Sequence, residues 1–191
     1  MRGGIVINFN DYPILKDNMS TLKETSIDKH EQNKVTYMTD SDRDAVNFDN
    51  VKEAYIENLG VHEVPKSNDA LFLNNRDDLV FVEFKNGFMD NAKKYAVRKK
   101  IYDSIIILTD ILDKGVSHLR DHMEYILVYN ESVNAGEKDV LNKNEAVVQH
   151  SEAFDYFAKS VGKMANEEYV CFGIKLFGSA CGRNYQLTDI P

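Results

Sequence analysis

Cysteine is scarce in this chain, and its two copies do not match any common pattern of cysteine chemistry. Cys171 and Cys181 lie ten residues apart, without a CxxC spacing and without a neighbouring pair of histidines. A disulfide framework or a zinc site needs more ligands than this, at recognisable spacings. The sequence therefore excludes a disulfide-rich scaffold and favours a reducing compartment, the cytoplasm.

Long hydrophobic runs are also missing. The longest aliphatic runs, such as residues 105–108, cover four positions, whereas a membrane span needs about 20. The segment that follows Met1 has no apolar stretch of the kind found in signal peptides. We therefore expect a soluble, cytoplasmic protein with no membrane partner.

Positive charge is in deficit, because 31 acidic residues face 23 basic ones and the formal net charge is −8. This balance opposes non-specific attraction to the phosphates of nucleic acids. One segment departs from it, since residues 93–100 hold five positive charges and no acid. These residues are candidate contacts to a nucleic-acid backbone, although a solvated helix face that complements nearby carboxylates is the simpler explanation of a charge run. The five are Lys93, Lys94, Arg98, Lys99 and Lys100.

The length of 191 residues and the hydrophobic content of 43% are enough for one well-buried core. We therefore predict a single domain over residues 1–191. Residues 1–45 show no sustained period and are assigned to short strands and loops. Beyond them, the pattern predicts helices at 47–59, 90–114 and 151–164, a hairpin of strands at 70–73 and 79–84, and strands at 124–129 and 168–177. This order indicates an α/β (α+β) fold with a central mixed sheet flanked by helices.

Two details of these elements are specific enough to test. Asp49 is the expected N-cap of the first helix, and Gly60 its terminator. Helical spacing predicts one apolar side for the long helix, consisting of Tyr95, Tyr102, Ile105, Ile106, Leu108, Ile111 and Leu112. The hairpin strands are apolar at nearly every position, so we expect the sheet to be covered on both faces.

The hairpin carries the candidate site. If its loop is centred near Arg76, antiparallel pairing sets Asp69 opposite Glu83. Glu83 and Lys85 are two positions apart on one strand, so their side chains share a face. The sequence therefore predicts that two carboxylates and one ammonium converge.

Two adjacent carboxylates near the ends of apolar strands require a neighbouring positive charge. A hard divalent cation such as Mg²⁺ prefers oxygen ligands and satisfies this requirement. A lysine beside it suits phosphodiester hydrolysis, by acting on a water molecule or by stabilising charge on the phosphate. Taken as spacing alone, the same residues also fit a simpler interpretation, in which Asp69 caps a turn and Glu83 pairs with Lys85 along a strand.

Two segments here resemble the motifs of the PD-(D/E)XK nuclease superfamily, which includes restriction endonucleases and Holliday-junction resolvases. They are Asn68-Asp69-Ala70-Leu71-Phe72 and Phe81-Val82-Glu83-Phe84-Lys85-Asn86-Gly87. The resemblance implies a restriction-endonuclease-like core over about residues 47–130, with extensions at both ends. It also implies Asp69 and Glu83 as ligands of Mg²⁺ or Mn²⁺, and Lys85 as the catalytic lysine.

The chain departs from the usual motifs of this family in three ways. Ser67-Asn68-Asp69 stands where Pro-Asp is common. The family core has three antiparallel strands before its second helix, so a third strand is expected elsewhere, near residues 35–38. Many members carry a glutamate on the first helix, and Glu53 and Glu57 are the candidates here. Both fall away from the apolar side of the helix, which favours a solvated position.

Two functions are compatible with this sequence. The first is a metal-dependent nuclease that hydrolyses phosphodiester bonds of DNA or RNA. The second is a non-catalytic protein that keeps a nuclease-like fold as a binding or interaction module. By analogy with nucleases that cut both strands, a homodimer is a further expectation.

Overall fold

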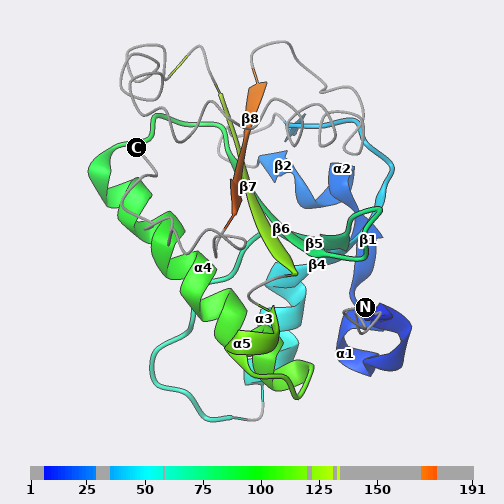
Figure 1. The fold of residues 1–191 in the computed structure, drawn as a ribbon. Coiled ribbons are helices and arrows are strands. Elements are labelled where there is room, and N and C mark those ends of the chain that lie inside the picture. Colours follow the sequence, from blue (N-terminus) through cyan, green and yellow to red (C-terminus); the bar gives the residue numbers. More distant parts are fainter. Residues whose placement is uncertain are drawn as a thin grey trace.

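The computed structural model describes residues 7–28, 35–57, 59–119, 122–130, 133 and 169–175, with residues 91, 94, 118 and 169–175 described by their backbone alone. Figure 1 shows a twisted sheet crossed on one side by a long helix. The elements are η1 (Phe9–Asp11), α1 (Pro13–Lys16), β1 (Met19–Thr21), α2 (Leu22–Thr25), β2 (Ile27–Asp28), β3 (Thr36–Tyr37), β4 (Asp44–Asn47), α3 (Phe48–Ile56), β5 (Ala70–Leu73), β6 (Leu79–Lys85), α4 (Asn91–Ile111), α5 (Val116–Leu119), β7 (Met123–Asn130) and β8 (Tyr169–Lys175).

The main sheet is mixed and has six strands in the order β1-β4-β5-β6-β7-β8. β6 and β7 are parallel, because the chain returns through α4, and the other neighbouring strands are antiparallel. A separate two-stranded sheet pairs β2 with β3. The α/β prediction, with a mixed sheet flanked by helices, is confirmed.

Side chains that alternate along the strands form a core on each face of the sheet. The first core holds Leu79 and Phe81 of β6, together with Val97, Ile101 and Leu108 of α4. The second holds their strand neighbours Val80, Val82 and Phe84, packed with residues such as Leu22 and Met38. This division follows from the two-residue period of a strand. It confirms that the hairpin is central and covered on both faces.

The turn between β5 and β6 has the chemistry that fixes its register. Asn74 Oδ1 accepts hydrogen bonds from the backbone N–H groups of Arg76 at 2.8 Å and Asp78 at 3.0 Å. Asp77 takes the left-handed conformation, with φ of 61°, which asparagine and aspartate tolerate better than most residues. The turn therefore holds β5 and β6 in one alignment.

The third antiparallel strand is β4, and the prediction of residues 35–38 for this role is wrong. β4 pairs with β5 through Val46 and Leu71, whereas residues 36 and 37 form β3 outside the main sheet. Ala45 and Val46 are fully buried. Such a short strand contains too few positions for an alternating pattern to be visible in the sequence.

The predicted N-cap of the first helix and part of the predicted apolar side of α4 need correction, whereas Ile105, Leu108 and Leu112 are buried as predicted. Asn47 caps α3, because its side chain accepts from the N–H of Asn50 at 3.1 Å, and Asp49 lies inside the first turn. On α4 the buried stripe includes Val97, Ile101, Ser104, Ile105 and Leu108. Tyr95, Tyr102 and Ile106 are instead 70%, 54% and 62% exposed. Apolar residues occur around the whole of this helix, so the sequence pattern alone did not select the face that packs on the sheet.

Two further predictions concern the end of the chain. The strand expected at residues 168–177 corresponds to β8, which pairs with β7. The helix expected at residues 151–164 lies outside the described residues. Among the residues that the structure describes, no helix combines the length and the low polarity needed to cross a membrane.

Candidate functional site

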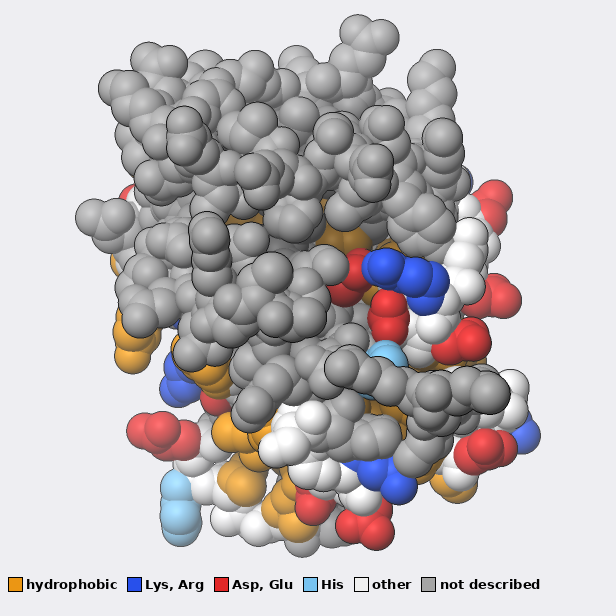
Figure 2. All heavy atoms as spheres, in the orientation of Figure 1, with side chains coloured by type: hydrophobic (Ala, Val, Ile, Leu, Met, Phe, Trp, Pro, Cys, Tyr) orange, Lys and Arg blue, Asp and Glu red, His pale blue; other side chains and the backbone are white. Residues whose placement is uncertain are grey.

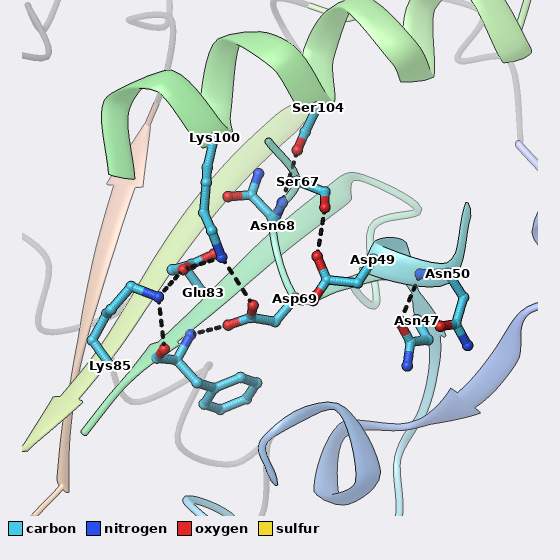
Figure 3. Close-up of polar contacts among 11 residues, drawn as sticks. Asn47, Asp49, Asn50, Ser67, Asn68, Asp69, Glu83, Lys85, Lys100 and Ser104 are labelled. Carbon is cyan, nitrogen blue, oxygen red and sulfur yellow. Dashed lines mark hydrogen bonds and ion pairs between the residues drawn. The ribbon is translucent and has the colours of Figure 1, made fainter. Parts of the chain in front are cut away.

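The hairpin register brings the predicted acidic residues together. β5 pairs with β6 through Ala70 and Val82, and the Asp69 N–H donates to the Val82 carbonyl at 3.1 Å. Asp69 and Glu83 are therefore opposite each other at the end of the hairpin, as predicted from the loop position. Their side chains, with that of Lys85, lie on the face of the sheet that α4 covers (Figure 3).

Two lysines converge on the carboxylate of Glu83. Lys85 makes a close ion pair with Glu83 Oε1, and its ammonium also donates to the Phe84 carbonyl at 3.2 Å. Lys100 is on α4, and its ammonium lies 2.6 Å from the same Oε1. Lys100 also reaches Asp69 Oδ1 at 3.2 Å. The Lys100 ammonium thus lies between the two carboxylates, and Figure 3 shows both lysines pointing toward Glu83.

Asp69 is held by the backbone as well as by charge. Its Oδ2 accepts a hydrogen bond from the Phe84 N–H at 2.6 Å. This contact uses one carboxylate oxygen and leaves Oδ1 directed at Lys100. The orientation of the carboxylate is therefore fixed by β6 itself, because the N–H is part of that strand.

A second set of contacts joins the loop before β5 to the helices. The Ser67 hydroxyl donates to Asp49 Oδ1 of α3 at 2.5 Å. The Asn68 N–H donates to the Ser104 hydroxyl of α4 at 2.9 Å. These bonds anchor the residues that directly precede Asp69 (Figure 3).

Sequence reasoning missed two residues of this site. The sequence pattern predicts Asp49 as a helix cap, yet its carboxylate accepts from Ser67, and its charge adds to the burial that raises the pKa of Asp69. Lys100 was assigned to phosphate contacts, yet it is an internal partner of both carboxylates. Glu53 and Glu57 are both exposed, and Glu53 pairs with Lys52 at 2.5 Å. The one available signal for Lys100 was its place on the helix, four residues before the buried Ser104 and three after Val97.

Burial dominates the electrostatics of the cluster. Burial raises the pKa of Glu83 to about 7, and the nearby Asp69 charge adds to this, against the two lysines. Burial also raises the pKa of Asp69, while Lys100 and Lys85 oppose the rise. For Lys100, burial alone lowers the pKa, but Glu83 and Asp69 reverse this and hold it above its ordinary value. Lys100 is therefore a permanent cation within the cluster.

Tyr125 of β7, which pairs with Phe81 of β6, is affected by the charges of the same carboxylates. It is completely buried, and its hydroxyl has no hydrogen-bond partner among the described residues. Burial, followed by the charges of Glu83 and Asp69, raises its pKa well above the ordinary value. Tyr125 therefore stays neutral, and its buried hydroxyl lies within reach of the charges of both carboxylates.

The raised pKa of Glu83 predicts a pH-dependent stability. The Glu83 carboxyl binds its proton more tightly in the folded protein than in the unfolded chain, where the ordinary pKa of a glutamate is 4.5. The stabilisation that protonated Glu83 contributes is complete below pH 4.5 and is lost as the pH rises through about 7. Between pH 5 and 8, we expect the free energy of unfolding of the wild type to fall by about 2–3 kcal/mol relative to Glu83→Gln.

Urea unfolding at several pH values measures this difference. The exposed Glu53 offers a matched control, because Glu53→Gln should follow the wild-type curve. Parallel pH curves for the wild type and Glu83→Gln would contradict the prediction.

Within the described part of the chain, the side chains of the basic run do not form one surface. Lys93 is exposed and donates to the Phe88 carbonyl at 2.7 Å, Lys99 is exposed, and Arg98 is half-buried. Lys100 is in the site, and the side chain of Lys94 lies outside the described residues. On the described part of the face in Figure 2, lysines and arginines lie in small groups among carboxylates. The four described side chains therefore face different environments.

The donor atoms of the cluster fit a hard cation. Asp69 Oδ1 and Glu83 Oε1 both face the position of the Lys100 ammonium. Neither oxygen of Glu83 makes a well-directed hydrogen bond within the described part of the chain. In that part of the chain no cluster of three or more His, Cys, Asp or Glu side chains suits a metal ion. Mg²⁺ is often held by only one or two carboxylates, with water completing its shell, so two carboxylates are compatible with it.

Comparison of the chain with protein-family models, with curated proteins and with solved structures found no match in any of the three.

Proposed function

We propose that the protein is a cytoplasmic, Mg²⁺-dependent phosphodiesterase that cleaves nucleic acid and has a restriction-endonuclease-like core. The observation that carries the proposal is the convergence of Asp69 and Glu83 on one cation position, with Lys85 beside them. Two carboxylates and a lysine on the end of a hairpin are the groups that the resemblance assigns to metal binding and catalysis.

The order of the elements supports the same proposal. β4, β5 and β6 are three consecutive antiparallel strands, and β7 follows through α4 as a parallel neighbour of β6. The resemblance requires three antiparallel strands before the second helix. β4 supplies a third such strand, in place of the residues 35–38 that the sequence pattern predicts.

Each residue has a distinct role in the proposed reaction. Asp69 and Glu83 would hold the metal ion, and the Phe84 N–H keeps the Asp69 carboxylate oriented. Bound Mg²⁺ would supply Lewis acidity and an activated water molecule. Lys85, at the partly exposed end of β6, is positioned to stabilise the negative charge that develops on the phosphate.

A cleavage assay on purified protein tests the proposal. Single- and double-stranded DNA and RNA are incubated with Mg²⁺ or Mn²⁺, with chelator as the blank. We expect metal-dependent cutting by the wild type and a decrease of about 100-fold or more in Glu83→Gln and Lys85→Met, because each removes charge stabilisation that the reaction uses. The exposed Glu53 again supplies the control, since Glu53→Gln should retain full activity.

Equal cutting by the wild type and Glu83→Gln would contradict the assignment of this cluster as the catalytic site. Absence of cutting on every substrate would favour a second function, a binding module that has kept the nuclease-like arrangement. One observation favours that alternative: the ammonium of Lys100 already compensates both carboxylates. A homodimer that cuts both strands is a further part of the proposal for the catalytic case.

A further inference from the structure

We infer that Lys100 occupies the divalent-cation position of this site, and that a metal ion binds only when the Lys100 ammonium leaves. Lys100 then sets the affinity of the site for metal. This inference rests on the assignment of Asp69 and Glu83 as the metal ligands under the proposed function.

The position of the ammonium carries the first step. Lys100 Nζ is 2.6 Å from Glu83 Oε1 and 3.2 Å from Asp69 Oδ1, so it joins the two oxygens that a shared metal ion would join. Lys85 differs, because its ion pair is with Glu83 and its side chain lies at the end of β6. Lys100 is therefore the lysine that bridges the proposed ligands.

The second step is exclusion by size and charge. Mg²⁺ requires carboxylate oxygens at about 2.1 Å, so an ion bound to both oxygens would fill the volume that Lys100 Nζ occupies. Two cations in contact inside a largely buried site also repel strongly. The ammonium and the metal ion are consequently alternative occupants.

The third step is that the side chain can move without the helix. α4 is anchored beside Lys100 by Val97, Ile101 and Ser104, all of which are fully buried. The Lys100 side chain is 19% exposed, and its four-carbon stem is flexible. The ammonium can thus swing toward solvent while α4 keeps its place on the sheet.

Calorimetric titration with Mn²⁺ tests the inference directly. Lys100→Met should bind Mn²⁺ at least about tenfold more tightly than the wild type, because the metal no longer displaces a charge-assisted contact. Lys99→Met is the matched control, since Lys99 is the neighbouring, exposed lysine, and its Kd should equal that of the wild type. Unchanged or weaker binding by a folded Lys100→Met protein would overturn the inference.

A second measurement uses the wild type and does not depend on folding of the variant. Lysine acylation, mapped by mass spectrometry, reports the solvent access of each ammonium. Saturating Mg²⁺ should increase the labelling rate of Lys100 several-fold and leave that of Lys99 unchanged. A Lys100 rate that does not respond to Mg²⁺ would overturn the inference.

These outcomes are separate from those of the cleavage assay. Tighter Mn²⁺ binding by Lys100→Met, with no cutting by the wild type, would support the inference and reject the nuclease. Cutting by the wild type, with no effect of Lys100→Met on metal affinity, would support the nuclease and reject the inference about Lys100.

Discussion

Replacing Phe81 with alanine is expected to lower the free energy of unfolding by about 3–5 kcal/mol, the cost of removing a large buried aromatic side chain. Phe81 is fully buried at the middle of β6. Its ring meets that of Phe48, the first residue of α3, edge to face with centroids 4.9 Å apart. The substitution therefore opens a cavity where the central strand meets the helix.

Chemical denaturation monitored by circular dichroism measures this loss. Phe88→Ala is the matched control, because Phe88 lies just beyond β6 and is 48% exposed. It should change stability by less than about 1 kcal/mol. Similar losses in the two variants would mean that Phe81 does not lie in the core described above.

Replacing Lys100 with alanine is expected to destabilise the metal-free protein by about 3 kcal/mol at pH 8. The reason is that the carboxylates of Asp69 and Glu83 lose the ammonium that they share. Glu83 is fully buried, and the side chain of Asp69 is only 15% exposed. A buried charge without a partner is costly, and the ion pair that remains among the described residues, with Lys85, involves Glu83 alone.

The same denaturation experiment at two pH values gives this prediction a second signature. The loss should be smaller at pH 5, because burial raises the pKa of Glu83 to about 7 and the carboxyl is then neutral. Lys99→Ala, at the adjacent exposed position, should change stability by less than about 0.5 kcal/mol at either pH. A Lys100→Ala protein as stable as Lys99→Ala would show that the cluster contributes nothing to the fold.

The accuracy of the sequence prediction depended on how local each feature is. The alignment of Asp69 with Glu83 was predictable, because a short turn links their strands and Asn74 fixes its geometry. The position of Lys85 on the same face followed from the two-residue period of a strand. β4 could not be predicted, because four residues carry no visible period.

The part of the site that was missed comes from other elements. Lys100 is 17 residues beyond Glu83 on α4, and Asp49 is 20 residues before Asp69 on α3. Their approach depends on how both helices pack against the sheet. The helical spacing of Lys100 from Val97 distinguishes it from the exposed Lys99 only once the face of α4 that packs on the sheet is known.

The sequence by itself determined the α/β class, the hairpin and the convergence of Asp69, Glu83 and Lys85, because turn chemistry and strand period are local properties of the chain. Only the tertiary structure decided which side of α4 faces the sheet and which lysine lies between the carboxylates. The physical reason is that α4 has apolar residues on all sides, so its rotation is set by packing against β6 and β7 and not by its own pattern. That rotation directs Lys100 into the site.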